Sequence, residues 1–185
     1  RHGQYIKEGE FGEIDKGLTV IGRRQAKWAG KALKHLPNPV LFTSPRQRAM
    51  ETAAIIGETI GLEPQVYPDL TEIPMIAFGN PINEATRASE INYWNDRRDG
   101  AQKTFSTFFR ASEDLQTEHV ILVCHGNVIR YFMCCFLGID VGTGPLFEPQ
   151  HCGITTCVFF NDGSIKRLIS LNEVGHLPLK LRTLN

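Results

Sequence analysis

The sequence lacks an excess of charge of either sign. Its 185 residues carry 20 basic and 20 acidic side chains, so the formal net charge is zero. Binding to nucleic acid or to an anionic membrane surface calls for a basic excess, and we expect neither partner. No apolar run approaches the ~20 residues that span a bilayer. Contact with a membrane would therefore need a segment upstream of Arg1, where the sequence has no initiating methionine.

Cysteine is sparse, and its spacing matches no metal-binding motif. The count is odd, and no Cys-x-x-Cys pair occurs. The five are Cys124, Cys134, Cys135, Cys152 and Cys157. Four of them lie in apolar stretches, which favours buried free thiols in a reducing compartment over disulfides. His151 has no partner at zinc-ligand spacing, so we expect no metal site.

The composition predicts one folded unit. Hydrophobic residues make up 42% of the chain and charged residues 22%. A globular chain of this length buries about two thirds of its unfolded surface. No internal repeat or low-complexity tract divides the sequence, so we expect a single domain over residues 1–185.

Short apolar runs alternate with longer segments of helical periodicity. The expected strands cover residues 40–43, 65–67, 120–124, 154–160 and 165–171. The expected helices cover about residues 20–36, 45–60, 88–109 and 128–137. Thr19 is the expected N-cap of the first helix, and Trp28 belongs to its apolar face. This order predicts an α/β layered fold with a mainly parallel sheet, followed by an antiparallel hairpin.

Two polar side chains fall where strands of such a sheet end. His125 follows an apolar strand directly, and Arg48 lies in the first turns of the helix after another strand. The carboxyl ends of parallel strands are where such sheets bind ligands. The helix that starts near Asn127 also offers its first N–H groups to an anion. These residues are therefore expected at one edge of the sheet.

The segment Arg1-His2-Gly3 can reach the same edge only if a strand precedes it. We therefore expect a strand upstream of Arg1, and Arg1 at the centre of the fold. A neutral imidazole such as His2 can attack a phosphate monoester because it brings no negative charge. Fixed cations then stabilise the equatorial oxygens. Arg1 and Arg48 suit that task because a guanidinium stays protonated and donates in pairs, with His125 as a third donor.

Five segments carry short motifs in an informative order. They are residues 1–3, 18–26, 44–52, 70–72 and 125–126. They match Arg-His-Gly, Leu-Thr-x-x-Gly-x-x-Gln-Ala, Ser-x-x-x-Arg-Ala-x-x-Thr, Leu-x-Glu and a second His-Gly. With these motifs the chain resembles the histidine phosphatase superfamily, also called phosphoglycerate-mutase-like. The resemblance implies a three-layer αβα fold with a mainly parallel central sheet.

The same resemblance assigns roles to five residues. His2 would be the nucleophile that becomes transiently phosphorylated, and Glu72 would be the proton donor. The phosphoryl group would be held by Arg1, Arg48 and His125. The implied enzyme needs no cofactor and no metal.

Within the superfamily, the chain is most similar to the mitochondrial serine/threonine protein phosphatase branch. Residues 1–5 resemble its Arg-His-Ser-Gln-Tyr, and residues 124–131 resemble its Cys-His-Ala-Asn-Val-Ile-Arg-Tyr. Gly3 and Gly126 depart from that branch, and residues 73–89 match it poorly. The implied activity is hydrolysis of phosphomonoesters in a phosphoprotein, with a small phosphate ester as the alternative substrate. The implied location is mitochondrial or cytoplasmic, with a homodimer as one option.

Each residue of the predicted site also has a purely structural interpretation. His2 could be a solvated terminal histidine, Arg48 an exposed helix arginine and His125 a core histidine. The motifs taken together favour the site. The acids that compete with Glu72 for its role are Glu13, Asp15 and Asp69. A general acid would need a raised pKa and hence partial burial.

Three further residues near the motifs have open roles. Arg46 adds a cation and is either an additional site residue or a surface residue. Asn127 is an additional candidate donor at the start of its helix. Arg130 is expected to be structural.

Three other functions compete with this hypothesis. Cys124 and Arg130 have the Cys-x-x-x-x-x-Arg spacing of cysteine-dependent phosphatases. The loop between them contains one glycine and bulky side chains, which disfavours a phosphate cradle. A phosphoglycerate mutase would return the phosphate to a second hydroxyl, and the chain is short for that. A non-catalytic binding module would not need the full set of catalytic residue types.

Overall fold

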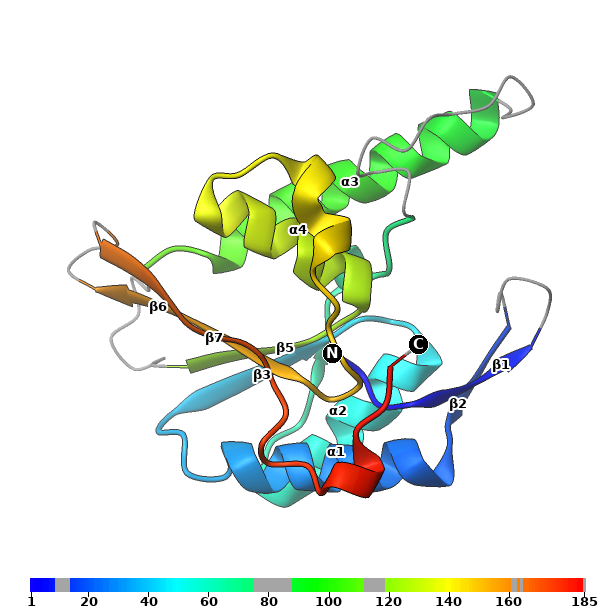
Figure 1. The fold of residues 1–185 in the computed structure, drawn as a ribbon, viewed down its shortest axis with the longest axis vertical. Helices are drawn as coiled ribbons and strands as arrows, with labels where there is room; N and C mark the ends of the chain where they lie inside the picture. Colours follow the sequence, from blue (N-terminus) through cyan, green and yellow to red (C-terminus); the bar gives the residue numbers. More distant parts are fainter. Residues whose placement is uncertain (9–13, 75–87, 112–118, 161–162, 164, 185) are drawn as a thin grey trace.

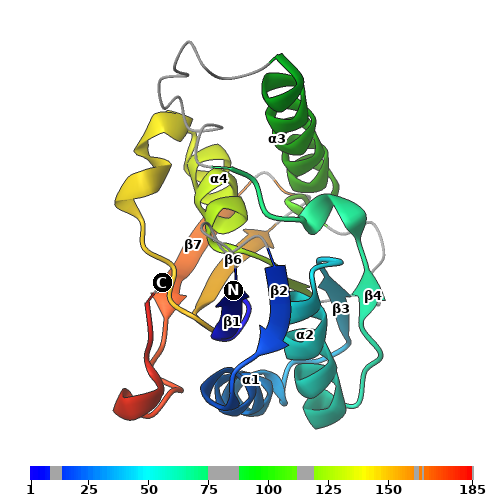
Figure 2. The same ribbon diagram turned by 90° about the vertical axis from the view of Figure 1, so that its right-hand side faces the viewer.

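Helices cover both faces of a central sheet in the computed structural model. It describes residues 1–8, 14–74, 88–111, 119–160, 163 and 165–184. Helices α1 (Val20–Leu33) and α2 (Gln47–Ile60) lie on one face of the sheet. Helices α3 (Ala88–Phe108) and α4 (Gly126–Leu137) lie on the other (Figures 1 and 2). This arrangement is the three-layer αβα fold that the sequence predicts.

The central sheet is parallel and has the strand order β4-β3-β5. Its strands are β3 (Pro39–Thr43), β4 (Gln65–Val66) and β5 (His119–Val123). Thr43 pairs with Val123, so β3 and β5 end at the same level. The residues that follow these two strands are therefore neighbours in space, as the predicted site requires.

The four helices confirm the predicted elements, with one correction. Thr19 caps α1 by accepting a hydrogen bond from the backbone of Gly22, as expected. Trp28, however, is 38% exposed and does not belong to the buried face of α1. That face consists mainly of small residues because α1 approaches α2 closely. A side chain on Gly30, for example, would meet Thr59 of α2.

Two antiparallel strand pairs complete the described fold. The predicted hairpin is present as β6 (Ile154–Phe160) and β7 (Ile165–Glu173). The pair β1 (Tyr5–Glu8) and β2 (Ile14–Leu18) was not expected, because its short segments contain few apolar residues. The described residues also include 3-10 segments at Pro68–Leu70, Val141–Leu146 and Leu179–Leu181.

Arg1, at the N-terminus marked in Figure 2, lies at the centre of the fold as predicted, and His2 is only 1% exposed. The backbone N–H of His2 donates to the carbonyl of Cys124 at 2.9 Å, and Cys152 N–H donates to the carbonyl of His2 at 3.2 Å. A cavity of about 600 Å³ lies beside them and is lined by residues of both β5 and β6 and by Arg1. The strand upstream of Arg1 stays a prediction.

The five cysteines are free thiols, which confirms the expectation of no disulfide among them. Three are buried and two are half-buried. In the part of the chain that the structure describes, every helix is too short or too polar to cross a membrane.

Candidate active site

His2 is a buried imidazole whose neutral tautomer is set by its neighbours. The ring is in a residue only 1% exposed. Its Nδ1 lies 2.9 Å from the carbonyl oxygen of Gly3, which can only accept, so Nδ1 carries the proton. Its Nε2 accepts a hydrogen bond from Nε of Arg48 at 3.1 Å and therefore bears the lone pair. Nε2 is the atom able to act as a nucleophile.

Arg48 lies in the first turns of α2 and is buried. Its guanidinium lies 4.5 Å from the ring centre of Tyr5, which holds the cation against an aromatic face. The hydroxyl of Thr52 donates to the carbonyl of Arg48. The same hydroxyl oxygen of Thr52 accepts a hydrogen bond from the backbone N–H of Gly3. Thr52 thus fixes the chain beside His2 to the helix that carries Arg48.

His125 follows β5 and is the N-cap residue of α4. Its ring centre is 5.1 Å from that of His2. Its Nε2 is 2.7 Å from the hydroxyl of Ser44, which follows β3. The parallel register of β3 and β5 produces this contact, and the backbone N–H of Ser44 also donates to Val123. His125 Nδ1 is buried and has no hydrogen-bond partner among the described residues.

Arg1 is bound by residues of the segment 148–153. Its buried Nη1 donates to the carbonyl of Pro149 at 2.5 Å and lies 4.0 Å from the carboxylate of Glu148. Its α-amino group donates to Gly153 at 3.1 Å. The guanidinium lies against Gly126, at the start of α4. The backbone therefore places a second cation at the edge of the sheet where His125 begins the next helix.

Glu72 is partly buried next to the start of α4. Its Oε1 accepts hydrogen bonds from the backbone N–H groups of Ile73 and Asn127, each at 3.2 Å. Asn127 therefore contributes through its backbone N–H, as its position at the helix start predicted. Glu72 interacts electrostatically with Arg48 and Arg1, so the acid belongs to the same cluster.

Burial and charge shift the pKa values of the acid and the base in opposite directions. Burial, aided by His125 and the two arginines, holds the pKa of His2 well below its ordinary value. Burial, with Arg48, Arg46 and Arg1, also lowers the pKa of His125. Burial raises the pKa of Glu72 to about 6, although the arginines oppose this change. Near pH 6 the cluster thus contains a neutral imidazole and a carboxylic acid that can donate a proton.

The structure describes the side chain of only one of the three acids that compete with Glu72, Asp69. Asp69 lies 3.8 Å from Lys103 in an ion pair, which gives it another partner. Glu13 lies outside the described residues, and so does the side chain of Asp15. Arg46 is half-buried and acts on His125 through its charge, so its role stays a prediction.

Cys124 and Arg130 do not form a thiolate–arginine pair. Burial raises the pKa of Cys124 to about 11, so the thiol stays protonated. The guanidinium of Arg130 instead bonds Phe147, Asn127 and Glu148. Among the described residues, no three metal-ligating side chains gather as a metal site would require.

Sequence reasoning missed several residues that support the site. His151 is buried, with its ring centre 5.8 Å from that of His2, and its Nδ1 is 2.8 Å from the hydroxyl of Thr183. Gln25 is buried and accepts from the backbone N–H of Gln4 while donating to Leu181. Gln25, Ser44 and Thr52 each stand at a fixed position of the quoted motifs, which was a usable signal. No pattern marked His151.

A family model described as histidine phosphatase superfamily (branch 1) matches residues 1–173. The chain belongs to the histidine phosphatase superfamily. Curated relatives include "Serine/threonine-protein phosphatase Pgam5, mitochondrial" of Drosophila grimshawi, 30% identical over 99% of this chain and 64% of the relative. The Drosophila persimilis protein of the same name is 32% identical over 97% and 63%. The chain thus spans slightly less than two thirds of the length of these relatives.

Solved structures of the superfamily share the fold. A phosphoserine phosphatase from Entamoeba histolytica, in complex with 3-phosphoglyceric acid, matches with a TM-score of 0.69 and 21% identity over 96% of each chain. A phosphoglycerate mutase from Plasmodium falciparum matches with a TM-score of 0.61 and 30% identity over 87% of this chain and 89% of that one. A phosphatase and a mutase therefore both share the fold of this chain.

Proposed function

We propose that the protein is a phosphomonoester hydrolase that acts through a phosphohistidine at His2. One observation carries the proposal. The unprotonated Nε2 of His2 is bonded to Arg48 inside a cluster that also contains Arg1, His125 and Glu72. A neutral nucleophile among cations, with an acid of raised pKa beside it, is the set of groups that phosphoryl transfer needs.

The proposed first step is in-line attack. The Nε2 lone pair of His2 forms a bond to phosphorus while the ester P–O bond breaks, and Glu72 gives its proton to the leaving oxygen. Arg1, Arg48 and His125 stabilise the charge on the equatorial oxygens. The Nδ1 proton of His2 keeps its hydrogen bond to Gly3, which supports the positive charge that the ring gains.

The second step hydrolyses the intermediate. The Glu72 carboxylate takes a proton from water, the water oxygen bonds to phosphorus, and the N–P bond breaks. Inorganic phosphate leaves, Nε2 regains its lone pair, and Glu72 is again protonated. These steps use only side chains of this chain, so we propose that the enzyme needs no metal or organic cofactor.

We propose phosphoserine or phosphothreonine in a protein as the substrate, and a mitochondrial location. The names of the Drosophila relatives support both points. A small phosphate ester is the alternative, supported by the Entamoeba phosphoserine phosphatase. A homodimer remains an untested part of the proposal, which sedimentation of the purified protein would decide.

A substrate panel with three variants tests this function. Rates of phosphate release are measured on phosphoserine and phosphothreonine peptides, on small phosphate esters and on an aryl phosphate, with and without a chelator. We expect His2→Ala to lose activity by at least ~10³-fold on every substrate. His35→Ala, at an exposed histidine of the same chain, and Cys124→Ala should stay active. An acid-labile phosphohistidine should form on every active protein and be absent from His2→Ala.

Two results would overturn the proposal. Activity that survives in His2→Ala and disappears in Cys124→Ala would assign the chemistry to the cysteine. An inactive wild-type chain that still binds phosphate would indicate a binding module.

A mutase is a second candidate function, because the Plasmodium phosphoglycerate mutase is 30% identical. A mutase would transfer the phosphoryl group of the intermediate to a second hydroxyl instead of water. Turnover of 3-phosphoglycerate that requires a bisphosphoglycerate would favour the mutase. Release of inorganic phosphate from the panel without a bisphosphoglycerate supports the hydrolase.

A further inference from the structure

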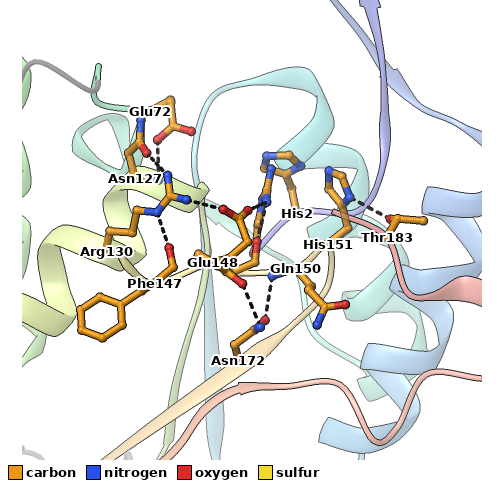
Figure 3. Close-up of polar contacts among 12 residues, drawn as sticks. His2, Glu72, Asn127, Arg130, Phe147, Glu148, Gln150, His151, Asn172 and Thr183 are labelled. Atoms are coloured by element: carbon orange, nitrogen blue, oxygen red, sulfur yellow. Dashed lines mark hydrogen bonds and ion pairs between the residues drawn. The ribbon is translucent and has the colours of Figure 1, made fainter. Parts of the chain in front are cut away.

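Arg130 of α4 joins the part of the site that contains Glu72 to the part that contains Arg1. Its side chain is only 11% exposed. Its Nε donates to the carbonyl of Phe147 at 2.6 Å, and its Nη1 donates to Asn127 Oδ1 at 2.8 Å. Its Nη2 donates to Glu148 at 2.7 Å. Figure 3 shows Arg130 between Asn127 and Glu148, with three different neighbours bound by one planar group.

The bond to Arg130 fixes which way the Asn127 amide points. A guanidinium can only donate, so the amide oxygen of Asn127 must face Arg130. The amide nitrogen is then turned away and donates to the carbonyl of Ile73 at 2.8 Å. The flipped amide would place N–H groups against the guanidinium and an oxygen against the Ile73 carbonyl. Arg130 therefore determines the contact between α4 and the chain that carries Glu72.

That contact orients the carboxyl group of Glu72. Oε1 of Glu72 accepts from the backbone of both Ile73 and Asn127. The hydrogen bond from the Asn127 amide to the Ile73 carbonyl holds these two donors next to each other. Because Oε1 is committed to these donors, Oε2 is the oxygen that holds the proton in the proposed reaction. A shift of the Ile73 backbone relative to α4 would move Oε2 relative to the leaving oxygen.

The other end of the network reaches Arg1. Glu148, which is 48% exposed, accepts from Arg130 through Oε2 and lies 4.0 Å from Arg1 through Oε1. The neighbouring carbonyl of Pro149 accepts directly from Arg1. Since Arg130 also holds Phe147, it anchors the segment 147–149 against which Arg1 is placed.

We propose that Arg130 is a positioning residue for proton transfer: through Asn127 it holds Glu72 in line with the leaving oxygen, and through residues 147–149 it holds Arg1. The inference rests on the proposed function, since it assigns the residue that aligns its general acid. In this role Arg130 acts through Asn127 and residues 147–149 and not on the reacting atoms themselves. Arg1 keeps its direct bonds to Pro149 and Gly153 when Arg130 is lost. The loss should therefore affect the protonation of the leaving group more than the attack by His2.

Leaving-group chemistry separates this role from a structural one. An aryl phosphate such as p-nitrophenyl phosphate releases a stable anion and needs little help from an acid. A phosphoserine peptide releases an alkoxide and depends on proton transfer. A misplaced acid thus slows formation of the phosphohistidine selectively from the second substrate, whereas its hydrolysis is the same step for both. Displacements near 1 Å can cost up to ~10²-fold. A general loss of folding would lower both rates equally.

The experiment compares Arg130→Met with Arg23→Met on both substrates. Arg23 offers a matched control, because its exposed guanidinium bonds Glu51 at the same 2.7 Å. For Arg130→Met we expect kcat/KM, which reports the steps up to departure of the leaving group, to fall ~10-fold or more on the phosphopeptide and to stay within ~3-fold on the aryl phosphate. Arg23→Met should match the wild type on both. Arg130→Lys keeps the charge but not the planar fork, so it should show the same selective loss.

Asn127→Ala covers the case in which Arg130→Met fails to fold. It removes the amide that transmits the effect and keeps the backbone N–H that binds Glu72. The same selective loss is expected, and the double variant should lose no more than the worse single variant. Equal losses on both substrates in Arg130→Lys and Asn127→Ala would overturn the inference. If the wild type is then still active and forms phosphohistidine, the proposed function stands and only the role of Arg130 is wrong. If the wild type is inactive, the proposed function itself is wrong.

Discussion

The two halves of the site are built in different ways. The half that contains the proposed nucleophile, His2 with Arg48 and His125, is here called the nucleophile half. It is held by backbone, because His2 bonds the main chain of Cys124 and Cys152 on either side. The acid half, Glu72 with its supports, depends on side chains, because the Asn127 amide and the Arg130 fork connect it to α4. A scaffold of main-chain bonds tolerates side-chain changes nearby. An acid held by two side chains can be moved without disturbing the nucleophile.

Burial shifts the pKa values of His2 and Glu72 in opposite directions. Removing a charge from water favours the neutral form, so burial lowers the pKa of His2 and raises that of Glu72 to about 6. The nucleophile is thereby kept unprotonated and the acid kept protonated in an overlapping pH range. The difference between the halves should appear in the effects of substitutions there.

The largest effect in this comparison is expected on the nucleophile half, from Arg48→Lys. Lysine keeps the charge but loses the planar donors that bind His2 Nε2 and pair with phosphate oxygens. We expect phosphohistidine formation to slow by ~10²–10³-fold on aryl and alkyl phosphates alike. Rapid-quench measurement of a single turnover gives this rate. Arg24→Lys, at an exposed arginine of α1, is the control, and an equal loss in it would contradict the role of Arg48.

A smaller and selective effect is expected on the acid half, from Glu72→Gln. The wild-type kcat/KM on a phosphoserine peptide should fall as pH rises through about 6, because Glu72 loses the proton it donates in the first step. It should fall again at lower pH, where His2 becomes protonated. Glu72→Gln should abolish the first decline and reduce kcat/KM by about 10²-fold. The aryl phosphate should be affected much less, and a pH profile that keeps its upper limb in Glu72→Gln would assign the acid elsewhere.

The nucleophile half was also the more predictable from sequence. Arg48 and His125 follow apolar runs, and parallel strands that end together must bring such residues together. His2 was placed by its motif and by the need for a neighbouring strand. The start of α1 followed from Thr19, which caps it. Local patterns suffice wherever a strand end or a helix cap determines where a side chain lies.

The acid half depends on contacts that no local pattern encodes. Glu72 was assigned only through a family motif, since its raised pKa arises from burial that appears after folding. The local sequence predicts only an ordinary helix arginine at Arg130. Its partners Glu148 and Phe147 lie 18 and 17 residues away along the chain, so no local pattern reveals them. His151 and Thr183 likewise meet through the return of the C-terminal segment. Trp28 was misassigned because periodicity does not reveal how closely α1 and α2 approach.

The smallest effect is expected from alanine substitutions at two glycines, Gly3 beside His2 and Gly126 at the start of α4. A side chain on Gly3 would meet the carbonyl oxygen of Gly22 at 2.7 Å, and that neighbour is backbone of α1 that cannot rotate away. A side chain on Gly126 would meet the guanidinium of Arg1 at 3.6 Å, an ordinary contact. We therefore expect Gly3→Ala to lower the free energy of unfolding by about 1–3 kcal/mol. Gly126→Ala, in a helix, should change it little or raise it by up to about 1 kcal/mol.

Urea denaturation of both variants measures the difference in their free energies of unfolding. Activity assays then show whether the substitution also disturbs the site. In Gly3→Ala the main chain beside His2 must shift away from α1, so loss of rate should accompany loss of stability on every substrate. Gly126→Ala should keep the wild-type rate on an aryl phosphate, because the bonds that orient His2 are untouched. If the two alanines destabilise the fold equally, close packing against α1 does not distinguish the nucleophile half. If only Gly3→Ala does so, the main chain that holds His2 is the least adjustable part of the site.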